Sequence, residues 1–337
     1  MSESSLSRGG SGRSPARREG DAAALGGLGG HIGAPHVLSI GSANVDFTVA
    51  VPRLPQPGET VTGGTLLVNH GGKGANQALA ARRLGAEVRF IGCVGSDASG
   101  RAIREALAAE QVDVSGLFAS PTAATGTALI VVDAEGRNQI AVAPGANWTL
   151  SIEQVAARVE DFAWADVVVC QLETPLPTVR WALEQARQRR VLTVLNPAPL
   201  PDEPLDFLAL VDYLTPNAGE AERLSGVAVG DPRAARHAAD TLRARGVAAV
   251  IVTLGEAGAV ACVAEVALHV PAFPVKVVDT TTAGDAFNAG LAVALGEHRD
   301  LPAALAFASA AAGLACTRRG AQPSLPSRAE VERLLAG

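Results

Sequence analysis

The chain has 337 residues, of which 48% are hydrophobic and 18% are charged, and its formal net charge is −6. This apolar content excludes extensive disorder, and the mildly acidic balance argues against a nucleic-acid partner, which more often calls for a basic surface. Four dispersed cysteines without a C-x-x-C pair, and the lack of any run of eighteen apolar residues, lead us to expect a cytoplasmic protein with reduced thiols and no membrane partner.

Residues 1–35 differ from the rest of the chain, because Gly, Ser, Arg and Ala dominate them without a helix or strand period. They also lack the apolar core of a secretory signal. We expect a disordered N-terminal extension, or an upstream start-site artefact, followed by one folded domain over residues 36–335.

The first half of the folded domain contains two kinds of strand. The expected helices cover residues 75–84 and 99–109, and the expected strands cover residues 37–40, 47–51, 60–68, 89–94, 127–132 and 138–142. The strands within about 46–69 and 125–143 are more polar than the others and read as paired. We therefore expect a small β-sheet that stands apart from the main domain as a lid.

From residue 150 onward, short apolar strands alternate regularly with helical patterns. The expected strands cover residues 166–170, 191–195, 213–215, 249–253 and 275–278, and the expected helices cover residues 151–160, 175–189, 218–225, 231–245 and 286–295. This alternation predicts an α/β fold with a mostly parallel central sheet and helices on both faces.

Polar side chains follow the ends of several expected strands. They are Asn44, Asp46, Glu173, Asn196, Asn217 and Asp285. Ligands of open α/β sheets bind at the carboxyl ends of the strands. We therefore expect these side chains to line one ligand site.

The most informative stretch is residues 279–288, DTTTAGDAFN, which we interpret as a tight turn between a strand and a helix. A helix start offers unpaired N–H groups and a positive dipole end, and the small residues Ala283 and Gly284 would let an anion approach them. Asp285 places a carboxylate beside that anion site, as phosphoryl transfer to a hydroxyl requires. An ordinary capping box between Thr282 and Asp285 is the alternative.

A second glycine-rich stretch, residues 71–77 with the sequence GGKGANQ, also leads into a helical pattern. It is not a Walker A loop, because Gly74 follows Lys73 where Ser or Thr is needed, and it carries no dinucleotide-binding fingerprint. Its Lys-x-x-Asn-Gln set suits the binding of hydroxyl groups.

Together, the two stretches resemble the C-terminal and N-terminal signatures of the ribokinase family of carbohydrate kinases. Further segments that resemble this family are residues 41–46, 57–61, 171–175, 196–199, 215–217 and 319–324. The resemblance extends from about Val37 to about Leu335. It implies the α/β fold of that family.

The resemblance also implies roles for the site residues. Asp285 would be the general base, and the amides of Ala283, Gly284 and Asp285 would hold the transferred phosphate. The residues that match sugar-binding positions are Asn44, Asp46, Gly72, Lys73, Asn76 and Glu173, together with Asp285. As alternatives, Asp46 would cap a turn, Lys73 would be a solvated surface charge, and Glu173 would pair with an arginine. Thr282 replaces a small residue of the family signature.

For the nucleotide, the resemblance implies contacts from Asn217, Glu220, Thr253, Gly255, Gly258, Gly284 and Ser309. Glu220 would act on Mg²⁺ through water, and a capping box with Asn217 is the alternative. A monovalent cation, K⁺, would lie at Asp279, Thr281, Ala315, Arg318, Gly320 and Ser324, mostly against backbone carbonyls. Asp279 alternatively only stabilises its turn.

The implied activity is ATP-dependent phosphorylation of D-ribose at the 5-hydroxyl, by a homodimer joined through the lid sheet. Alternatives within the family are kinases of deoxyribose, fructose or adenosine. Outside it they are a catalytically inactive sugar-binding protein and a dinucleotide-dependent dehydrogenase, whose glycine fingerprint is missing.

Overall fold

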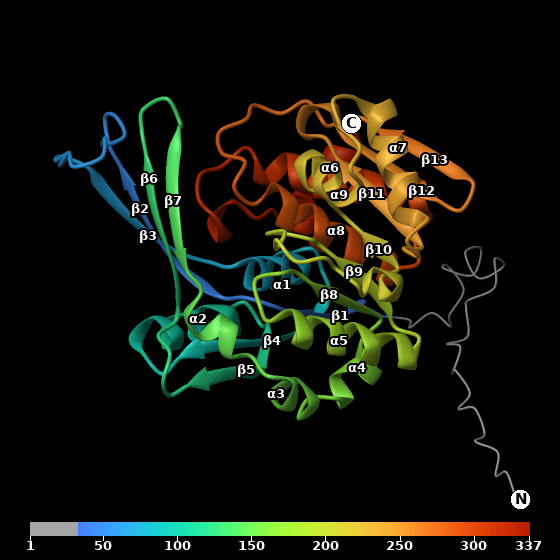
Figure 1. The fold of residues 1–337 in the computed structure, drawn as a ribbon, viewed down its shortest axis with the longest axis horizontal. Helices are drawn as coiled ribbons and strands as arrows, with labels where there is room; N and C mark the ends of the chain where they lie inside the picture. The colour runs from blue at the N-terminus through green and yellow to red at the C-terminus, as the bar shows by residue number, and fades with distance from the viewer. Residues whose placement is uncertain (1–32) are drawn as a thin grey trace, which may run out of the picture.

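The computed structural model describes residues 33–337, and nearly all of the expected N-terminal extension lies outside the described residues. A nine-stranded sheet in the order β13-β12-β11-β10-β9-β8-β1-β4-β5 forms the centre of the main body (Figure 1). Its strands are β1 (His36–Ile40), β4 (Glu87–Gly95), β5 (Asp113–Ser120), β8 (Val167–Cys170), β9 (Leu192–Leu195), β10 (Tyr213–Leu214), β11 (Ala249–Thr253), β12 (Ala259–Val263) and β13 (Val266–Val270). Across this sheet, neighbouring strands from β11 through β10, β9, β8, β1 and β4 to β5 pair in parallel. The strands β12 and β13 add an antiparallel hairpin beside β11, at one edge of the sheet.

Helices cover both faces of this sheet, as the alternating pattern predicts. They are α1 (Lys73–Arg83), α2 (Ala98–Ala109), α3 (Ile152–Ala156), α4 (Glu160–Trp164), α5 (Leu176–Arg189), α6 (Ala218–Ser225), α7 (Pro232–Arg243), α8 (Ala283–Gly296), α9 (Leu301–Ala315) and α10 (Arg328–Leu335). The short 3₁₀ helices are η2 (Gly145–Thr149), η3 (Leu208–Leu210), η4 (Gly255–Ala257) and η5 (Gln322–Ser324).

The strands divide the interior into two hydrophobic cores. Along β8, Val167 and Val169 pack into the core beneath α1, α8 and α9, whereas Val168 and Cys170 pack into the core beneath α5 and α7. Successive side chains of a strand point to opposite faces, so a strand that is apolar at every position is buried on both. Each such fully buried aliphatic side chain contributes roughly 1.5–3 kcal/mol to stability.

A second sheet of four strands, in the order β3-β2-β6-β7, stands apart from the main body in Figure 1. Its strands are β2 (Asn44–Ala50), β3 (Thr65–Gly71), β6 (Gly126–Val132) and β7 (Asn138–Ala143), and we call it the small sheet. Asp46 is paired with Asn69 and Ala128, so these three side chains lie in one row on one face. The prediction of a small separate sheet is thus confirmed.

Three expectations about the elements were wrong. Residues 275–278 form no strand: Val277 and Val278 are exposed, and the amide of Val278 donates to the carbonyl of Cys316 across 2.8 Å. The β-branched composition favours a strand, but a strand needs a partner edge, and here the chain follows the end of α9 instead. Residues 60–64 are loop, in which Gly63 has a φ of +86°. Residues 151–160 divide between α3 and the start of α4.

Candidate active site

The start of α8 lies next to α1, and the two helices bring the two glycine-rich stretches together. Thr282 precedes α8, but its side chain makes no capping bond, and its Oγ1 lies 2.6 Å from Ser324 Oγ in the interior. Asp285 likewise does not reach back to Thr282. The alternative of a capping box between these residues is therefore wrong, and the Asp285 carboxylate is directed to other partners.

Those partners are two amides of α1. Asn76 Nδ2 donates to Asp285 Oδ2 across 2.9 Å, and Gln77 Nε2 donates to Asp285 Oδ1 across 2.9 Å. Asp285 is only 5% exposed. Burial raises the pKa of its carboxyl group, although Lys73 and the two amide donors oppose that rise. A buried carboxylate with raised proton affinity, held from both oxygens, is well suited to take a proton from a hydroxyl.

Gly284 precedes Asp285 and faces solvent. A Cβ added to Gly284 would meet nothing within 4 Å, so the first turn of α8 borders open space. The amide of Ala283 donates to the carbonyl of Thr280 across 3.2 Å. The amides that follow it at this helix start, next to open space, can donate hydrogen bonds to a phosphate oxygen without a steric barrier. Ala283 lies between Thr282 and Gly284 and is half-buried.

The glycines around α1 are required by close packing of backbone on backbone. Gly72 has a φ of +87°, and an added Cβ would lie 2.7 Å from Ala43 Cα. A Cβ on Gly74 would lie 2.6 Å from the carbonyl carbon of Gly41. This contact presses the start of α1 against the turn between β1 and β2. Gly72 thereby lies beside Asn44, where β2 begins.

Four acidic side chains surround Lys73, which is half-buried at the start of α1. Burial alone would lower the pKa of the Lys73 ammonium, but the nearby carboxylates outweigh burial and raise it. These carboxylates belong to Asp285, Glu173, Glu220 and Asp46. Lys73 is therefore a charged group at the centre of the site, not the solvated surface lysine of the alternative.

Asp46 extends from the small sheet toward this cluster. Burial raises its pKa to about 6, and the carboxylates of Glu173 and Asp285 add to the rise while Lys73 opposes it. Glu173 accepts hydrogen bonds from Ser42 Oγ and from the amide of Lys73. Within residues 33–337, no arginine pairs with Glu173, so its alternative role is not seen there.

Two asparagines complete the polar lining. Asn44 Oδ1 accepts from Asn147 Nδ2 across 2.7 Å, and Asn147 also accepts from the amide of Ala43. The Oδ1 atom of Asn76 is buried without a protein partner. An orphaned acceptor inside a polar site fits the donated hydrogen bond of a sugar hydroxyl. Asn147 was missed from the sequence because nothing local marks its contact with β2.

The expected nucleotide residues Asn217 and Glu220 form a capping box at the start of α6. Glu220 donates its amide to Asn217 Oδ1, and Asn217 donates its amide to Glu220 Oε2, each across 2.9 Å. The structural alternative is therefore present. Burial raises the pKa of Glu220, while the amide of Asn217 and the charge of Lys73 oppose that rise. Glu220 thus interacts electrostatically with Lys73 while it caps α6.

The remaining nucleotide candidates lie on neighbouring elements. Thr253, at the end of β11, forms a β-bridge with Asn217. Gly255 borders open space, but a Cβ on Gly258 would lie 2.0 Å from the carbonyl oxygen of Val270, so packing of the β12–β13 hairpin accounts for that glycine. Ser309 lies within α9 and is buried.

Two of the expected cation residues, Thr281 and Gly320, contact Asp279. Its carboxylate accepts from Thr281 Oγ1 across 2.5 Å and from the amides of Thr281 and Gly320 across 3.0 Å each. Burial would raise the pKa of Asp279, but these hydrogen bonds outweigh burial and lower it. Asp279 therefore fixes its turn, as in the alternative, and also ties that turn to residue 320. Ser324 donates to the carbonyl of Ala321.

Two further members of that set have other surroundings. The guanidinium of Arg318 pairs with Glu330 on α10, and Ala315 is buried at the end of α9. In the part of the chain that the structure describes, no cluster of three or more His, Cys, Asp or Glu side chains is arranged to hold a metal ion. A cation at this turn would therefore depend on backbone carbonyls.

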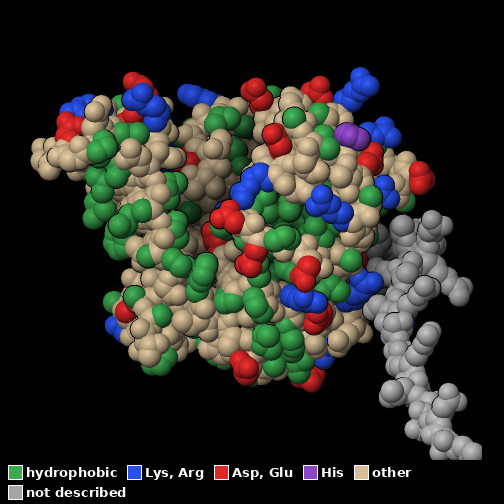
Figure 2. Space-filling model, viewed as in Figure 1, with side chains coloured by type: hydrophobic (Ala, Val, Ile, Leu, Met, Phe, Trp, Pro, Cys, Tyr) green, Lys and Arg blue, Asp and Glu red, His purple; other side chains and the backbone are tan. Residues whose placement is uncertain are grey.

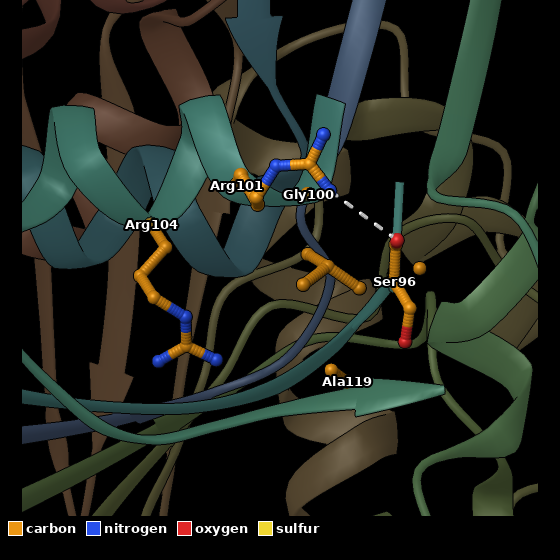
Figure 3. A pocket seen from close by; sticks show the side chains of 7 residues that line it. Ser96, Gly100, Arg101, Arg104 and Ala119 are labelled. Atoms are coloured by element: carbon orange, nitrogen blue, oxygen red, sulfur yellow. Dashed lines mark hydrogen bonds between the residues drawn. The ribbon is translucent and has the colours of Figure 1, made fainter. Parts of the chain in front are cut away.

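A hollow of about 250 Å³ lies away from these residues, between α2 and the ends of β4 and β5 (Figure 3). Arg104 donates to the carbonyls of Val114 and Leu117, and Arg101 donates to the carbonyl of Ser96 across 3.5 Å. Both guanidinium groups thus have backbone partners.

Within residues 33–337, no helix combines the length and the apolar character needed to cross a bilayer.

Comparison with known proteins defines the family. Residues 34–328 match the model of the pfkB family of carbohydrate kinases. The ribokinase of Haemophilus influenzae is 41% identical over 296 residues, which is 88% of this chain and 97% of that protein. The deoxyribokinase of Salmonella typhi is 35% identical over 86% of this chain and 95% of its own length. The structure of Arabidopsis thaliana ribokinase complexed with ribose and ATP superposes with a TM-score of 0.83, at 33% identity, over 91% of this chain and 100% of that one. The chain therefore belongs to the pfkB family of carbohydrate kinases.

Proposed function

We propose that this protein transfers the γ-phosphoryl group of ATP to the 5-hydroxyl of D-ribose. One observation carries the proposal: the buried carboxylate of Asp285 directly follows Gly284, whose position borders open space at the start of α8. A proton acceptor and an anion cradle are thus adjacent. The relatives named ribokinase, at 38–41% identity, support ribose as the acceptor.

In this proposal, the Asp285 carboxylate accepts the proton of the sugar hydroxyl while the oxygen of that hydroxyl attacks the phosphorus. The amides of Gly284 and Asp285 would stabilise the negative charge on the transferred group, and the amide of Ala283 would join them only by leaving the carbonyl of Thr280. The leaving group is ADP. Asn76 and Gln77 hold the Asp285 carboxylate in place throughout.

The ribose hydroxyls would be held by the polar side chains around Lys73. Asp46 and Glu173 accept hydrogen bonds, Lys73 donates them, and the orphaned Oδ1 of Asn76 accepts one more. Asn44 would reach the sugar from the start of β2, in an orientation that Asn147 sets. Gly72 would contribute to the sugar site through its backbone, beside the start of β2 at Asn44, against which it packs.

The nucleotide residues would be Asn217, Glu220, Thr253, Gly255, Gly258, Gly284 and Ser309. The open space beside Gly284 fits a terminal phosphate. Mg²⁺, when bound, would neutralise charge on the phosphates, with Glu220 acting through water. A K⁺ ion would lie near residues 279–281 and 320–324, where Asp279 already fixes the turn. The carboxylates of Glu220 and Asp279 are oxygen ligands of the kind that hard cations such as Mg²⁺ take.

The small sheet would act as a lid that closes over the sugar and excludes water from ATP. Figure 2 shows a hollow between that sheet and the main body, and hydrophobic side chains over the outer part of the sheet. Leu66, Val68, Leu129, Ile140 and Val142 are each more than 50% exposed. Because such an apolar sheet needs cover, we propose a homodimer joined through it.

An ATP-dependent enzyme with four free cysteines fits the cytoplasm.

The experiment that tests the proposed function compares ribose, deoxyribose, fructose and adenosine as acceptors of the purified protein with ATP and Mg²⁺. Ribose should give the highest kcat/KM, and product analysis should place the phosphate on the 5-oxygen. Deoxyribose is the second candidate, because the Salmonella typhi relative is named deoxyribokinase. A preference for adenosine, or no transfer to any of the four, would overturn the proposal.

A further inference from the structure

A chain of buried amide side chains runs from Gln171, at the carboxyl end of β8, to Asp285. Gln171 Nε2 donates to Gln77 Oε1 across 2.6 Å. Gln77 Nε2 in turn donates to Asp285 Oδ1 across 2.9 Å and to Asn196 Oδ1 across 3.2 Å. Gln77 is 1% exposed, and Gln171 is fully buried. Gln77 is the glutamine of the Lys-x-x-Asn-Gln set of residues 73–77, a set that suits the binding of hydroxyl groups.

The surroundings of Gln77 determine how its amide is oriented. A glutamine amide has two N–H donors and one carbonyl acceptor. Gln77 Nε2 donates to Asn196 Oδ1 and to Asp285 Oδ1, two oxygens that carry no hydrogen. Gln77 Oε1 accepts a hydrogen bond from Gln171 Nε2. A reversed amide would put its oxygen against the carboxylate of Asp285. Gln77 therefore has one orientation and no hydrogen left for a substrate.

We propose that Gln77 is a positioning residue for Asp285, holding the carboxylate in the rotation and the ionised state that proton transfer requires. This proposal rests on the proposed function. Asn76 also bonds to Asp285, but it is expected to meet the sugar as well. Gln77 contacts Asp285, and its remaining N–H is taken by Asn196, so it does not bind the sugar hydroxyl for which its sequence motif is suited.

Positioning is needed because an aspartate carboxylate can rotate about its Cα–Cβ and Cβ–Cγ bonds unless both of its oxygens are held. A donor that is itself anchored on two other side chains, Gln171 and Asn196, fixes one of those oxygens. The same N–H stabilises the ionised form against the burial that raises the pKa of Asp285. The charged groups that face Asp285 are Lys73, Glu173 and Asp46, from α1, the end of β8 and β2.

Two substitutions separate positioning from packing. Gln77→Met keeps the length and apolar volume of the side chain but removes the donor. Gln77→Glu keeps the shape but places a second carboxyl beside Asp285, where the two groups would share a proton. Both should lower kcat by roughly ten- to a hundredfold, with KM for ribose changed much less. In a plot of kcat against pH, both should move the fall in kcat on the acidic side to higher pH, because Asp285 loses a donor that stabilises its ionised form. Gln77→Glu should move it further.

Gln171→Met is the graded comparison, because it removes one of the two anchors of Gln77 while the Gln77 amide can still donate to Asp285. Its acidic limb should move clearly less than that of Gln77→Met. The series is repeated in an Asp46→Asn background, so that the titration of Asp46 does not contribute to the limb. A wild-type profile in Gln77→Met, or a Gln77→Glu enzyme as active as the wild type, would overturn the proposal. So would an equal shift in Gln171→Met.

Asp285→Asn is measured in parallel to separate this proposal from the proposed function. If Asp285→Asn remains active, Asp285 is not the base and the proposed function itself is wrong. If Asp285→Asn is inactive while the Gln77 variants keep the wild-type kcat and pH profile, the positioning role alone is wrong.

Discussion

Gly284 and Asp285 are neighbours in the chain but face opposite surroundings. Gly284 borders open space on the solvent side of α8, whereas Asp285 is 5% exposed and held between two amides of α1. The first turn of α8 is thus open on the side where a phosphate would bind and closed on the side where the proton acceptor lies. This division makes the two positions separately testable.

Gly284→Ala should lower turnover without loss of stability. No atom opposes the new methyl group, so the free energy of unfolding should stay the same or rise by up to about 1 kcal/mol. The methyl group would occupy the space proposed for the phosphate, so kcat should fall by about tenfold or more. Chemical denaturation and steady-state kinetics on one preparation measure both. Gly290→Ala in the same helix is the control and should destabilise the fold, because its Cβ would lie 2.9 Å from Ala308 Cα.

Asp285→Asn should lower kcat by at least about a hundredfold while ribose binding largely survives, because the amide cannot accept the proton. Asparagine keeps the size of the side chain, although one of its atoms would face an amide donor of Asn76 or Gln77. Ribose affinity is measured by calorimetry and turnover by a coupled assay. Near-normal turnover would rule out Asp285 as the base.

Much of this site could be predicted from local sequence. The glycines and the Lys-x-x-Asn spacing of residues 72–76, and the small residues before Asp285, are consecutive in the chain and have local physical reasons. The bond between Gln77 and Asp285 joins residues 208 positions apart, and no local pattern shows which amide meets which carboxylate. The strand expected at residues 275–278 failed for a related reason, since composition gives strand propensity but does not supply a pairing edge.

Asp46 should make stability and sugar binding depend on pH in opposite directions. Its pKa rises from 3.8 to about 6 on folding, so its contribution to the free energy of unfolding is fully present below pH 3.8 and is lost as pH rises through 6. Asp46→Asn cannot ionise, so without sugar its stability relative to the wild type should increase between pH 4 and 6 and then level off. Thermal unfolding at several pH values measures this difference.

The ionised form of Asp46 is the better acceptor for a sugar hydroxyl. Ribose affinity of the wild-type protein should therefore increase as pH rises through about 6, and this increase should be absent in Asp46→Asn. A variant that keeps the same pH dependence of binding would show that another group is responsible.

Thr282→Ala should have a small effect on activity. The hydroxyl of Thr282 contacts Ser324 Oγ in the interior and is not directed to the open side of α8. Its removal should cost about 1 kcal/mol of stability, since one buried hydrogen bond is lost, and should leave kcat within about threefold. Ser324→Ala should show a similar loss of stability. A large loss of turnover in Thr282→Ala, without unfolding, would place its hydroxyl at the phosphate.

Leu129→Lys should dissociate the proposed homodimer. Leu129 is 57% exposed and shares a row with Phe47 and Val68, on the face of the small sheet opposite to Asp46. A lysine ammonium in an apolar interface is costly to desolvate, so sedimentation should report a monomer at concentrations where the wild type is a dimer. Ile140→Lys is the matched control, because Ile140 is equally exposed but lies on the face that carries Asp46. If Leu129→Lys sediments like the wild type, that face of the sheet does not join two copies, and if Ile140→Lys alone dissociates them, the contact uses the opposite face.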